Sequence, residues 1–193
     1  MAEADRRRWE ARYTEGDAPV HGTVNRWLAH QPAVFRRFEQ NSPAPQALDI
    51  ACGAGGTLLW LAQRGWRVTG VDISPAALAL AQGLLATAGM AARATLIEAD
   101  LDNWRPAAAS CDLLTCFYFL DRRLWPSMRE AVRPQGVICL STFHTGRLAK
   151  RPDTDPTHLL EPGELASLVS SWGWTVLAAE TGVQMESVAG QKV

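Results

Sequence analysis

The chain has 193 residues, of which 47% are hydrophobic and 20% are charged, a composition that fits one globular domain with a sizeable core. Nineteen basic and twenty acidic residues leave a net charge of −1, so bulk charge gives no reason to expect a nucleic-acid or membrane partner. No apolar run is long enough to cross a bilayer, and the amino terminus lacks the apolar stretch of a secretion signal. These features predict a cytoplasmic protein.

The cysteine pattern gives no indication of a disulfide framework or a metal centre. The four cysteines are Cys52, Cys111, Cys116 and Cys139. They form no CxxC pair and no group with histidine at the spacing of metal ligands. We therefore expect four reduced, buried thiols and no metal site.

Residues 1–45 carry short helical patterns and no strand. One surrounds Arg6–Arg12, a second is marked by Val24, Trp27 and Leu28, and a third starts at Pro32. This segment is too small to form a core of its own. We expect it to be a helical cap on residues 46–193, within a single domain.

From residue 46 onward, strand-like and helix-like runs alternate, which is typical of an α/β fold. The expected strands are Ala47–Ala51, Arg67–Val71, Ala94–Glu98, Asp112–Phe117, Gly136–Phe143, Trp174–Ala179 and Gln184–Val193. Several are continuous apolar runs, as expected where helices cover both faces of a parallel sheet. The pattern predicts a Rossmann-like, seven-stranded sheet.

The last connection restricts the topology further. Only Glu180–Val183 separates the sixth and seventh strands, whereas a parallel crossover needs roughly a dozen residues or more. We therefore expect strands one to six to be parallel and the seventh to be antiparallel. This architecture differs from the six-stranded parallel sheet of the dinucleotide-binding dehydrogenases.

A turn of very small residues follows the first strand, and Asp49 precedes it in the sequence Leu48-Asp-Ile-Ala-Cys-Gly-Ala-Gly-Gly56. Small residues at Ala51, Gly53 and Gly55 would allow a ligand to approach the backbone closely. The turn alone is weak evidence, because it lies within one substitution of the dinucleotide pattern GxGxxG. A nicotinamide-dependent oxidoreductase therefore remains an alternative.

Three acids at consecutive strand ends separate the two interpretations. Asp49 would disfavour a pyrophosphate but suit an ammonium group. Asp72, at the end of the second strand, can accept hydrogen bonds from both ribose hydroxyls. Asp100, after the third, can accept one from an adenine amino group. Together they favour a cationic, phosphate-free adenosyl compound.

These residues give the chain a specific resemblance. It is similar to the class I S-adenosylmethionine-dependent methyltransferases, whose first motif corresponds to Asp49-Ile-Ala-Cys-Gly-Ala-Gly55. Later motifs resemble Val71-Asp-Ile-Ser-Pro75, Ala99-Asp-Leu101 and Val132-Arg-Pro-Gln-Gly136. The chain departs from the pattern at Ala51 and Gln135, where many members have glycine.

Within that family, the tellurite-resistance-type methyltransferases look closest. The similar stretches are Trp9-Glu-Ala-Arg-Tyr13, His21-Gly-Thr-Val-Asn25 and Leu159-Leu-Glu-Pro-Gly-Glu-Leu165. The substrate-side His-Arg pair of that subgroup has no match in Gly182-Val-Gln-Met-Glu-Ser187, which puts tellurite chemistry in doubt.

The resemblance implies S-adenosylmethionine as the cofactor and adds further contacts to it. Ile73 would flank the adenine, Leu101 would offer its backbone to the ring, and Phe117 would lie beside the methionine portion. Trp9 and Tyr13 would close over the cofactor from the cap.

Catalytic candidates follow the fourth and fifth strands. They are Tyr118, Asp121 and His144, with His144 favoured because it lies at the carboxyl end of the fifth strand. His21 and His158 are further candidates for lining the acceptor pocket. We expect the cap and residues 145–162 to form the walls of that pocket.

The sequence thus predicts methyl transfer to a small nucleophile, such as a thiol or a chalcogen oxyanion, by in-line displacement. One alternative is a non-catalytic regulatory protein that binds S-adenosylmethionine. The less favoured alternative is the nicotinamide-dependent oxidoreductase. The sequence leaves the oligomeric state open.

Overall fold

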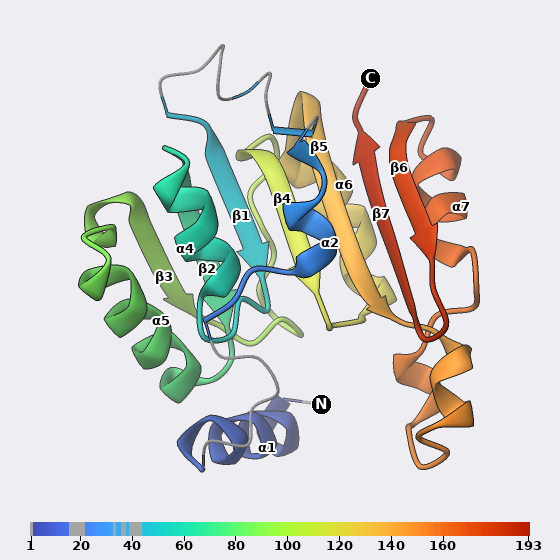
Figure 1. The fold of residues 1–193 in the computed structure, drawn as a ribbon, viewed down its shortest axis with the longest axis horizontal. Coiled ribbons are helices and arrows are strands. Elements are labelled where there is room, and N and C mark those ends of the chain that lie inside the picture. Colours follow the sequence, from blue (N-terminus) through green and yellow to red (C-terminus); the bar gives the residue numbers. More distant parts are fainter. Residues whose placement is uncertain (1, 16–21, 33, 36–37, 39–43) are drawn as a thin grey trace.

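The structure is a computed structural model that describes residues 2–15, 22–32, 34–35, 38 and 44–193 (Figure 1). Its centre is a seven-stranded sheet in the order β3-β2-β1-β4-β5-β7-β6. The strands are β1 (Gln46–Ile50), β2 (Arg67–Asp72), β3 (Ala94–Glu98), β4 (Cys111–Phe117), β5 (Val132–Phe143), β6 (Thr175–Thr181) and β7 (Met185–Gln191). The predicted Rossmann-like α/β class is therefore confirmed.

The strand directions also follow the prediction. The pairs β1–β2, β1–β4, β2–β3 and β4–β5 are parallel. β7 is antiparallel to both β5 and β6, which makes β6 parallel to the first five strands. The three residues between β6 and β7 permit only a hairpin.

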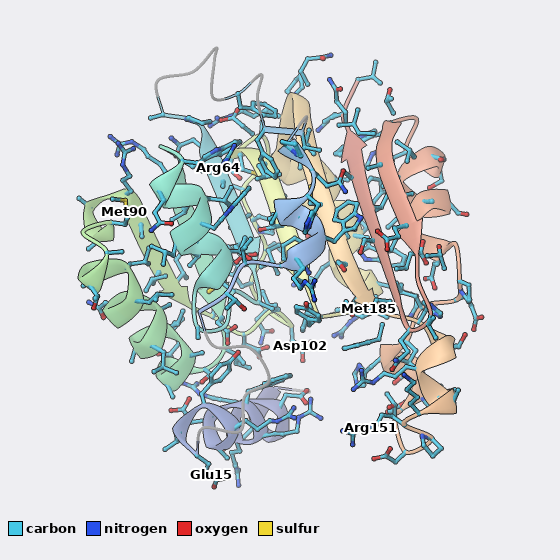
Figure 2. The ribbon with its side chains drawn as sticks, viewed as in Figure 1. Glu15, Arg64, Met90, Asp102, Arg151 and Met185 are labelled. Atoms are coloured by element: carbon cyan, nitrogen blue, oxygen red, sulfur yellow. The ribbon has the colours of Figure 1, made fainter. Side chains whose placement is uncertain are left out.

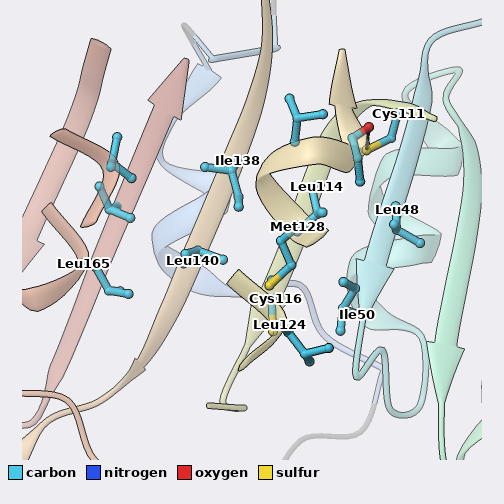
Figure 3. Packing of buried hydrophobic residues seen from close by; sticks show 14 of the residues in the cluster. Leu48, Ile50, Cys111, Leu114, Cys116, Leu124, Met128, Ile138, Leu140 and Leu165 are labelled. Atoms are coloured by element: carbon cyan, nitrogen blue, oxygen red, sulfur yellow. Dashed lines mark hydrogen bonds between the residues drawn. The ribbon is translucent and has the colours of Figure 1, made fainter. Parts of the chain in front are cut away.

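Helices cover both faces of the sheet (Figure 1). One face carries α2 (Arg26–Ala29), α4 (Gly56–Gln63) and α5 (Pro75–Thr87), and the other carries α6 (Trp125–Ala131) and α7 (Glu164–Ser171). Short 3-10 turns complete the described elements at Ala91–Arg93, Arg122–Leu124, Thr145–Ala149 and Pro156–His158. Figure 3 shows the α6–α7 side of the core, where Met128 and Leu165 pack against β-strand residues such as Leu114 and Leu140.

The helix beginnings agree with local sequence rules. The Ser74 hydroxyl accepts a hydrogen bond from the Ala77 amide at the start of α5, and Pro75 occupies the first turn. The amino-terminal cap of α7 is supplied by a residue of strand β7. The buried Glu186 carboxylate of β7 accepts hydrogen bonds from the amides of Gly163 and Leu165. This contact fixes α7 against β7.

The fifth strand begins earlier than the expected start at Gly136. Val132 already pairs with Cys111, and the register shifts before Val137 pairs with Leu113. Pro134 and the left-handed Gln135 (φ 64°) lie inside that irregular stretch, which reads as a turn in the sequence. Because of this bulge, the first residues of β5 do not show the pattern of a strand in the sequence.

The amino-terminal segment crosses the α2–α4 face. Leu28 and Phe35 are fully buried, and the Phe35 ring contacts that of Trp66 edge to face. Gly56 permits this crossing, because a Cβ there would collide with the Thr23 carbonyl oxygen. Residues 22–32 and 34–35 of this segment are thus packed onto the sheet.

Two further expectations concern the cysteines and the membrane-spanning helices. All four cysteines are buried and form no disulfide. Among the helices that the structure describes, none combines the length and apolar composition needed to cross a bilayer.

Candidate functional site

The glycine turn lies at the carboxyl end of β1. Three of its residues have left-handed backbone: Ala51 (φ 56°), Gly53 (φ 52°) and Gly55 (φ 81°). Such angles cost nothing for glycine but about 1 kcal/mol or more for alanine, so Ala51 holds a strained position. The turn tolerates no side chain at Gly53, since a Cβ there would lie 2.5 Å from the Tyr13 hydroxyl oxygen.

Asp49 is a buried acid directly below this turn. Its carboxylate accepts a hydrogen bond of 2.6 Å from the Thr115 hydroxyl of β4. Burial, together with the negative charge of Asp72 and against the lowering effect of the Thr115 hydrogen bond, raises the pKa of Asp49 to about 7. Among the described residues, no cationic side chain contributes to this shift. The site therefore contains a carboxyl group that a cationic ligand would ionise.

Asp72, at the end of β2, ties the glycine turn to the start of α5. Its two oxygens accept hydrogen bonds from the amides of Gly53 (2.8 Å) and Ser74 (3.0 Å). Burial raises the pKa of Asp72, against the lowering effect of these bonds. The Ile73 amide also contributes a hydrogen bond, but a carboxylate has about four lone-pair sites, so Asp72 can still accept a hydrogen bond from a ribose hydroxyl.

Asp100 completes the expected trio after β3. Its carboxylate accepts hydrogen bonds from the Asp102 amide (2.9 Å) and the Asn103 side chain (3.2 Å). Next to it Leu101 is buried, while Ile73 after β2 is half-buried. Because β1, β2 and β3 are adjacent and parallel, their carboxyl ends lie at the same edge of the sheet. The three acids are thus brought together as expected.

Helix α1 (Ala2–Thr14) lies over this edge (Figure 1). Glu10 accepts hydrogen bonds from the Ser74 hydroxyl (2.6 Å) and the Ala76 amide (3.1 Å). Arg6 forms an ion pair with Glu98 of β3. The helix therefore attaches to the first turn of α5 and to the end of β3.

The attachment places Tyr13 beside the glycine turn. Trp9 and Tyr13 lie on the same side of α1 with their ring centroids 6.2 Å apart. Burial raises the pKa of Tyr13, as does the charge of Asp72. Tyr13 therefore covers the turn as a neutral phenol.

A hollow lined in part by Met185 (Figure 2) opens next to Phe117, where β4 ends. Its volume is about 560 Å³, in the range of small-molecule sites. Its lining residues are Asn25, Arg26, Trp27, His30, Gln31, Tyr118, Ser141, Glu180, Gly182, Val183, Gln184, Met185 and Ser187. We call it the β4–β7 cavity.

Tyr118 stands at the mouth of the β4–β7 cavity. Its left-handed backbone (φ 60°) is uncommon for a bulky residue, and its amide donates to the Ser141 carbonyl (2.8 Å). A hydrogen bond joins its hydroxyl to the Asn25 side chain, and burial raises the Tyr118 pKa. The side chain is still 41% exposed, so it is available to a ligand.

His144 has a different environment from the one expected. The ring is buried, its Nδ1 accepts a hydrogen bond from the Gly146 amide (3.0 Å), and its Nε2 lies 2.9 Å from the Gly182 carbonyl oxygen. This arrangement requires the neutral tautomer with the proton on Nε2. Both ring nitrogens are then used to hold the backbone after β5.

The two remaining described candidates, Asp121 and His158, do not line the cavity. Asp121 accepts hydrogen bonds from Arg123 and caps the turn before α6. His158 is exposed, and His21 lies outside the described residues. Walls of the β4–β7 cavity come from residues 25–31 and from the β6–β7 turn, and residues 145–162 do not line it.

Several residues of the site were not found from the sequence. Glu10, Thr115 and Asn25 act through contacts with residues far away in the chain, which no local pattern reveals. Ser141 and Ser187 could have been noticed in the sequence, because a hydroxyl in a buried apolar strand is unusual.

Comparisons with known proteins agree with this geometry. Residues 47–136 match the family model of a methyltransferase domain. The chain is 30% identical over 153 residues to the 2-heptyl-1-hydroxyquinolin-4(1H)-one methyltransferase of Mycobacteroides abscessus. That match covers 76% of this chain and 66% of the relative, so the chain spans just under two thirds of the relative's length.

Solved structures show the same fold. A geranyl diphosphate C-methyltransferase from Streptomyces coelicolor, bound to S-adenosyl-L-homocysteine, has a TM-score of 0.73 at 13% identity, covering 100% of this chain and 98% of that one. The protein of a DhpI-SAM-HEP complex has a TM-score of 0.65 at 22% identity, covering 99% and 97%.

Residues 47–136 thus match a methyltransferase domain, and the fold is shared with solved structures of proteins bound to S-adenosylmethionine or S-adenosyl-L-homocysteine. The site residues fit this cofactor. A buried acid with no cationic partner among the described residues suits its ammonium group, and a second acid suits its ribose. A turn of small residues suits close contacts with the backbone.

The pKa of Asp49 leads to a pH prediction. Binding of an ammonium ligand requires the ionised carboxylate, whose population falls as the pH drops below about 7. We expect the affinity for S-adenosylhomocysteine to be about tenfold weaker at pH 6 than at pH 8, measured by isothermal titration calorimetry. The variant Asp49→Asn should bind weakly at both pH values with no such slope. An unchanged slope in this variant would place the titrating group elsewhere.

The attachment of α1 gives a second prediction. Glu10→Ala removes the acceptor of two hydrogen bonds at the start of α5, and we expect S-adenosylhomocysteine to bind about three- to tenfold more weakly. The melting temperature should fall by less than about 3 °C, because α1 is largely exposed. Glu3→Ala is the matched control, since the Glu3 carboxylate contacts the exposed Arg7 of the same helix. Equal affinities of the two variants for S-adenosylhomocysteine would show that α1 does not cover the ligand.

Proposed function

We propose that this protein transfers the methyl group of S-adenosylmethionine to an oxygen of a small, planar, hydroxylated aromatic compound. The observation that carries the proposal is a buried carboxyl group, Asp49, at a glycine turn one strand away from an open cavity of about 560 Å³. A cofactor at the turn and an acceptor in the cavity would be neighbours.

On this proposal the cofactor contacts divide among the strand ends. Asp49 holds the ammonium group, Asp72 the ribose hydroxyls and Asp100 the adenine amino group. The backbone of Ala51, Gly53 and Gly55 approaches the amino-acid portion, with Phe117 beside it. Ile73 and Leu101 contact the adenine ring, and Trp9 and Tyr13 cover the bound molecule. Burial of the first two acids supports this division, since desolvation strengthens their interaction with a ligand.

The cofactor supplies a methyl group already activated on a sulfonium. An oxygen lone pair of the acceptor forms the new O–CH₃ bond as the S–CH₃ bond breaks, which leaves S-adenosylhomocysteine, and the hydroxyl proton passes to solvent. The protein's part is to align the acceptor with the S–CH₃ bond and to exclude water. Tyr118, at the cavity mouth, is the residue we propose to contact the reacting oxygen.

Three observations support the acceptor class. The relative that is 30% identical is named for a hydroxyquinolone acceptor. The cavity is lined by aromatic and thioether side chains, from Trp27, Tyr118 and Met185, which suit a planar aromatic compound. The near-neutral charge of the chain fits a small acceptor better than a nucleic acid. A thiol or a chalcogen oxyanion, suggested by the tellurite-type resemblance, is the second acceptor class to be tested.

The test begins with cofactor choice and then turns to turnover. We expect S-adenosylhomocysteine to bind and NAD to give no signal in parallel calorimetric titrations. With S-adenosylmethionine present, release of S-adenosylhomocysteine should be fastest with 2-heptyl-1-hydroxyquinolin-4(1H)-one or a related hydroxyarene, and slower with alkyl thiols or tellurite. Tight NAD binding would instead support the oxidoreductase alternative. Binding without turnover on any acceptor would support the regulatory alternative.

The environment of His144 gives a separate prediction. A general base contributes about 10²- to 10⁴-fold to a rate, whereas a ring with both nitrogens held by backbone contributes to stability. His144→Asn keeps an acceptor for the Gly146 amide. We expect a kcat within about threefold of the wild-type value, an unchanged pH–rate profile and a lower melting temperature. A hundredfold fall in kcat at full cofactor occupancy would restore the catalytic role expected from the sequence.

A further inference from the structure

The floor of the β4–β7 cavity is polar where the rest of the same sheet face is apolar. On that face, Val137 and Cys139 of β5 and Ala189 of β7 are fully buried in the core under α2 and α4. Two residues further along each strand are Ser141 and Ser187, which pair across the ladder and line the cavity. The face therefore changes from apolar to hydroxyl-bearing at the cavity.

The two hydroxyls form a closed pair. Their oxygens lie 2.7 Å apart, and either can be the donor. Within the described part of the chain, this is the one hydrogen bond that each side chain makes. Because the pair contains two hydroxyl protons and uses one, it always retains a proton for another acceptor. Ser141 is 1% exposed and Ser187 is 6% exposed, so a ligand in the cavity meets the pair mainly at Ser187.

The charges around the cavity restrict what this pair can bind. The two hydroxyls are neutral, and the charged lining residues Arg26 and Glu180 are exposed at the surface. Among the described lining residues, no buried cation lies beside the pair to neutralise an oxyanion at the floor. A neutral carbonyl oxygen, in contrast, can take the remaining proton at no such cost.

We propose that Ser141 and Ser187 together are the hydrogen-bond anchor of the acceptor site, and that they bind a neutral carbonyl oxygen of a planar aromatic acceptor. This inference rests on the proposed function, because it assigns the contact that orients the acceptor. The Tyr118 amide, which donates to the Ser141 carbonyl, links the anchor to the ring at the cavity mouth. The anchor selects carbonyl-bearing aromatic compounds over inorganic oxyanions.

Two non-reactive compounds test the anchor by binding alone. 2-Heptylquinolin-4(1H)-one has the carbonyl, and 2-heptylquinoline lacks it. We expect the wild-type protein with S-adenosylhomocysteine bound to prefer the quinolone by about three- to tenfold in calorimetric titrations. The double variant Ser141→Ala/Ser187→Ala should reduce this preference to less than twofold, with S-adenosylhomocysteine affinity unchanged. The double variant is needed because either hydroxyl alone could still donate.

Thr142→Val is the matched control. It removes a buried hydroxyl from the same strand, at the neighbouring position whose side chain points to the opposite face. This variant should keep the wild-type preference for the quinolone. A preference that survives in the double variant would overturn the anchor, as would a wild-type protein that binds the two compounds equally or binds neither. Failure of S-adenosylhomocysteine to bind the wild-type protein would instead refute the proposed function.

Discussion

The structure depends on the burial of a carboxyl group among parallel strands. Asp49 is in the centre of the sheet, flanked by β2 and β4, and its one side-chain hydrogen bond comes from Thr115. A group with its pKa raised by burial makes the folded state less stable as the pH rises from its unfolded value toward about 7. The ligand-free protein therefore carries this acid at a cost in stability. A cationic ligand would offset that cost by its attraction to the ionised carboxylate.

The other parts of the site surround this acid with backbone rather than with charge. Asp72 accepts hydrogen bonds from amides of the glycine turn and of the start of α5. These bonds hold the turn in place before a ligand binds. Glu10 adds α1 to the same helix start. The residues of β1, β2 and α1 that we propose to hold the cofactor are thus joined by hydrogen bonds around the first turn of α5. Such preorganisation lowers the entropic cost of binding.

Much of the fold could be predicted because its determinants are local. Apolar runs, Ser74-Pro75 and the short β6–β7 connection each specify their element without long-range information. The acids could be located for the same reason, since parallel strands bring their carboxyl ends to one edge. The bulge around Pro134 and Gln135 was missed because a turn and an irregular strand have the same local pattern. Glu186, Glu10 and the Ser141–Ser187 pair could not be assigned, because their roles depend on tertiary contacts.

The central claim is that the edge formed by β1 and β2 holds a cationic adenosyl compound between two buried acids. A crystal structure with S-adenosylhomocysteine tests this most directly. The account predicts the ligand's ammonium nitrogen within hydrogen-bond distance of an Asp49 oxygen and both ribose hydroxyls on Asp72. A ligand found with its ammonium group in solvent, or bound away from the glycine turn, would contradict it.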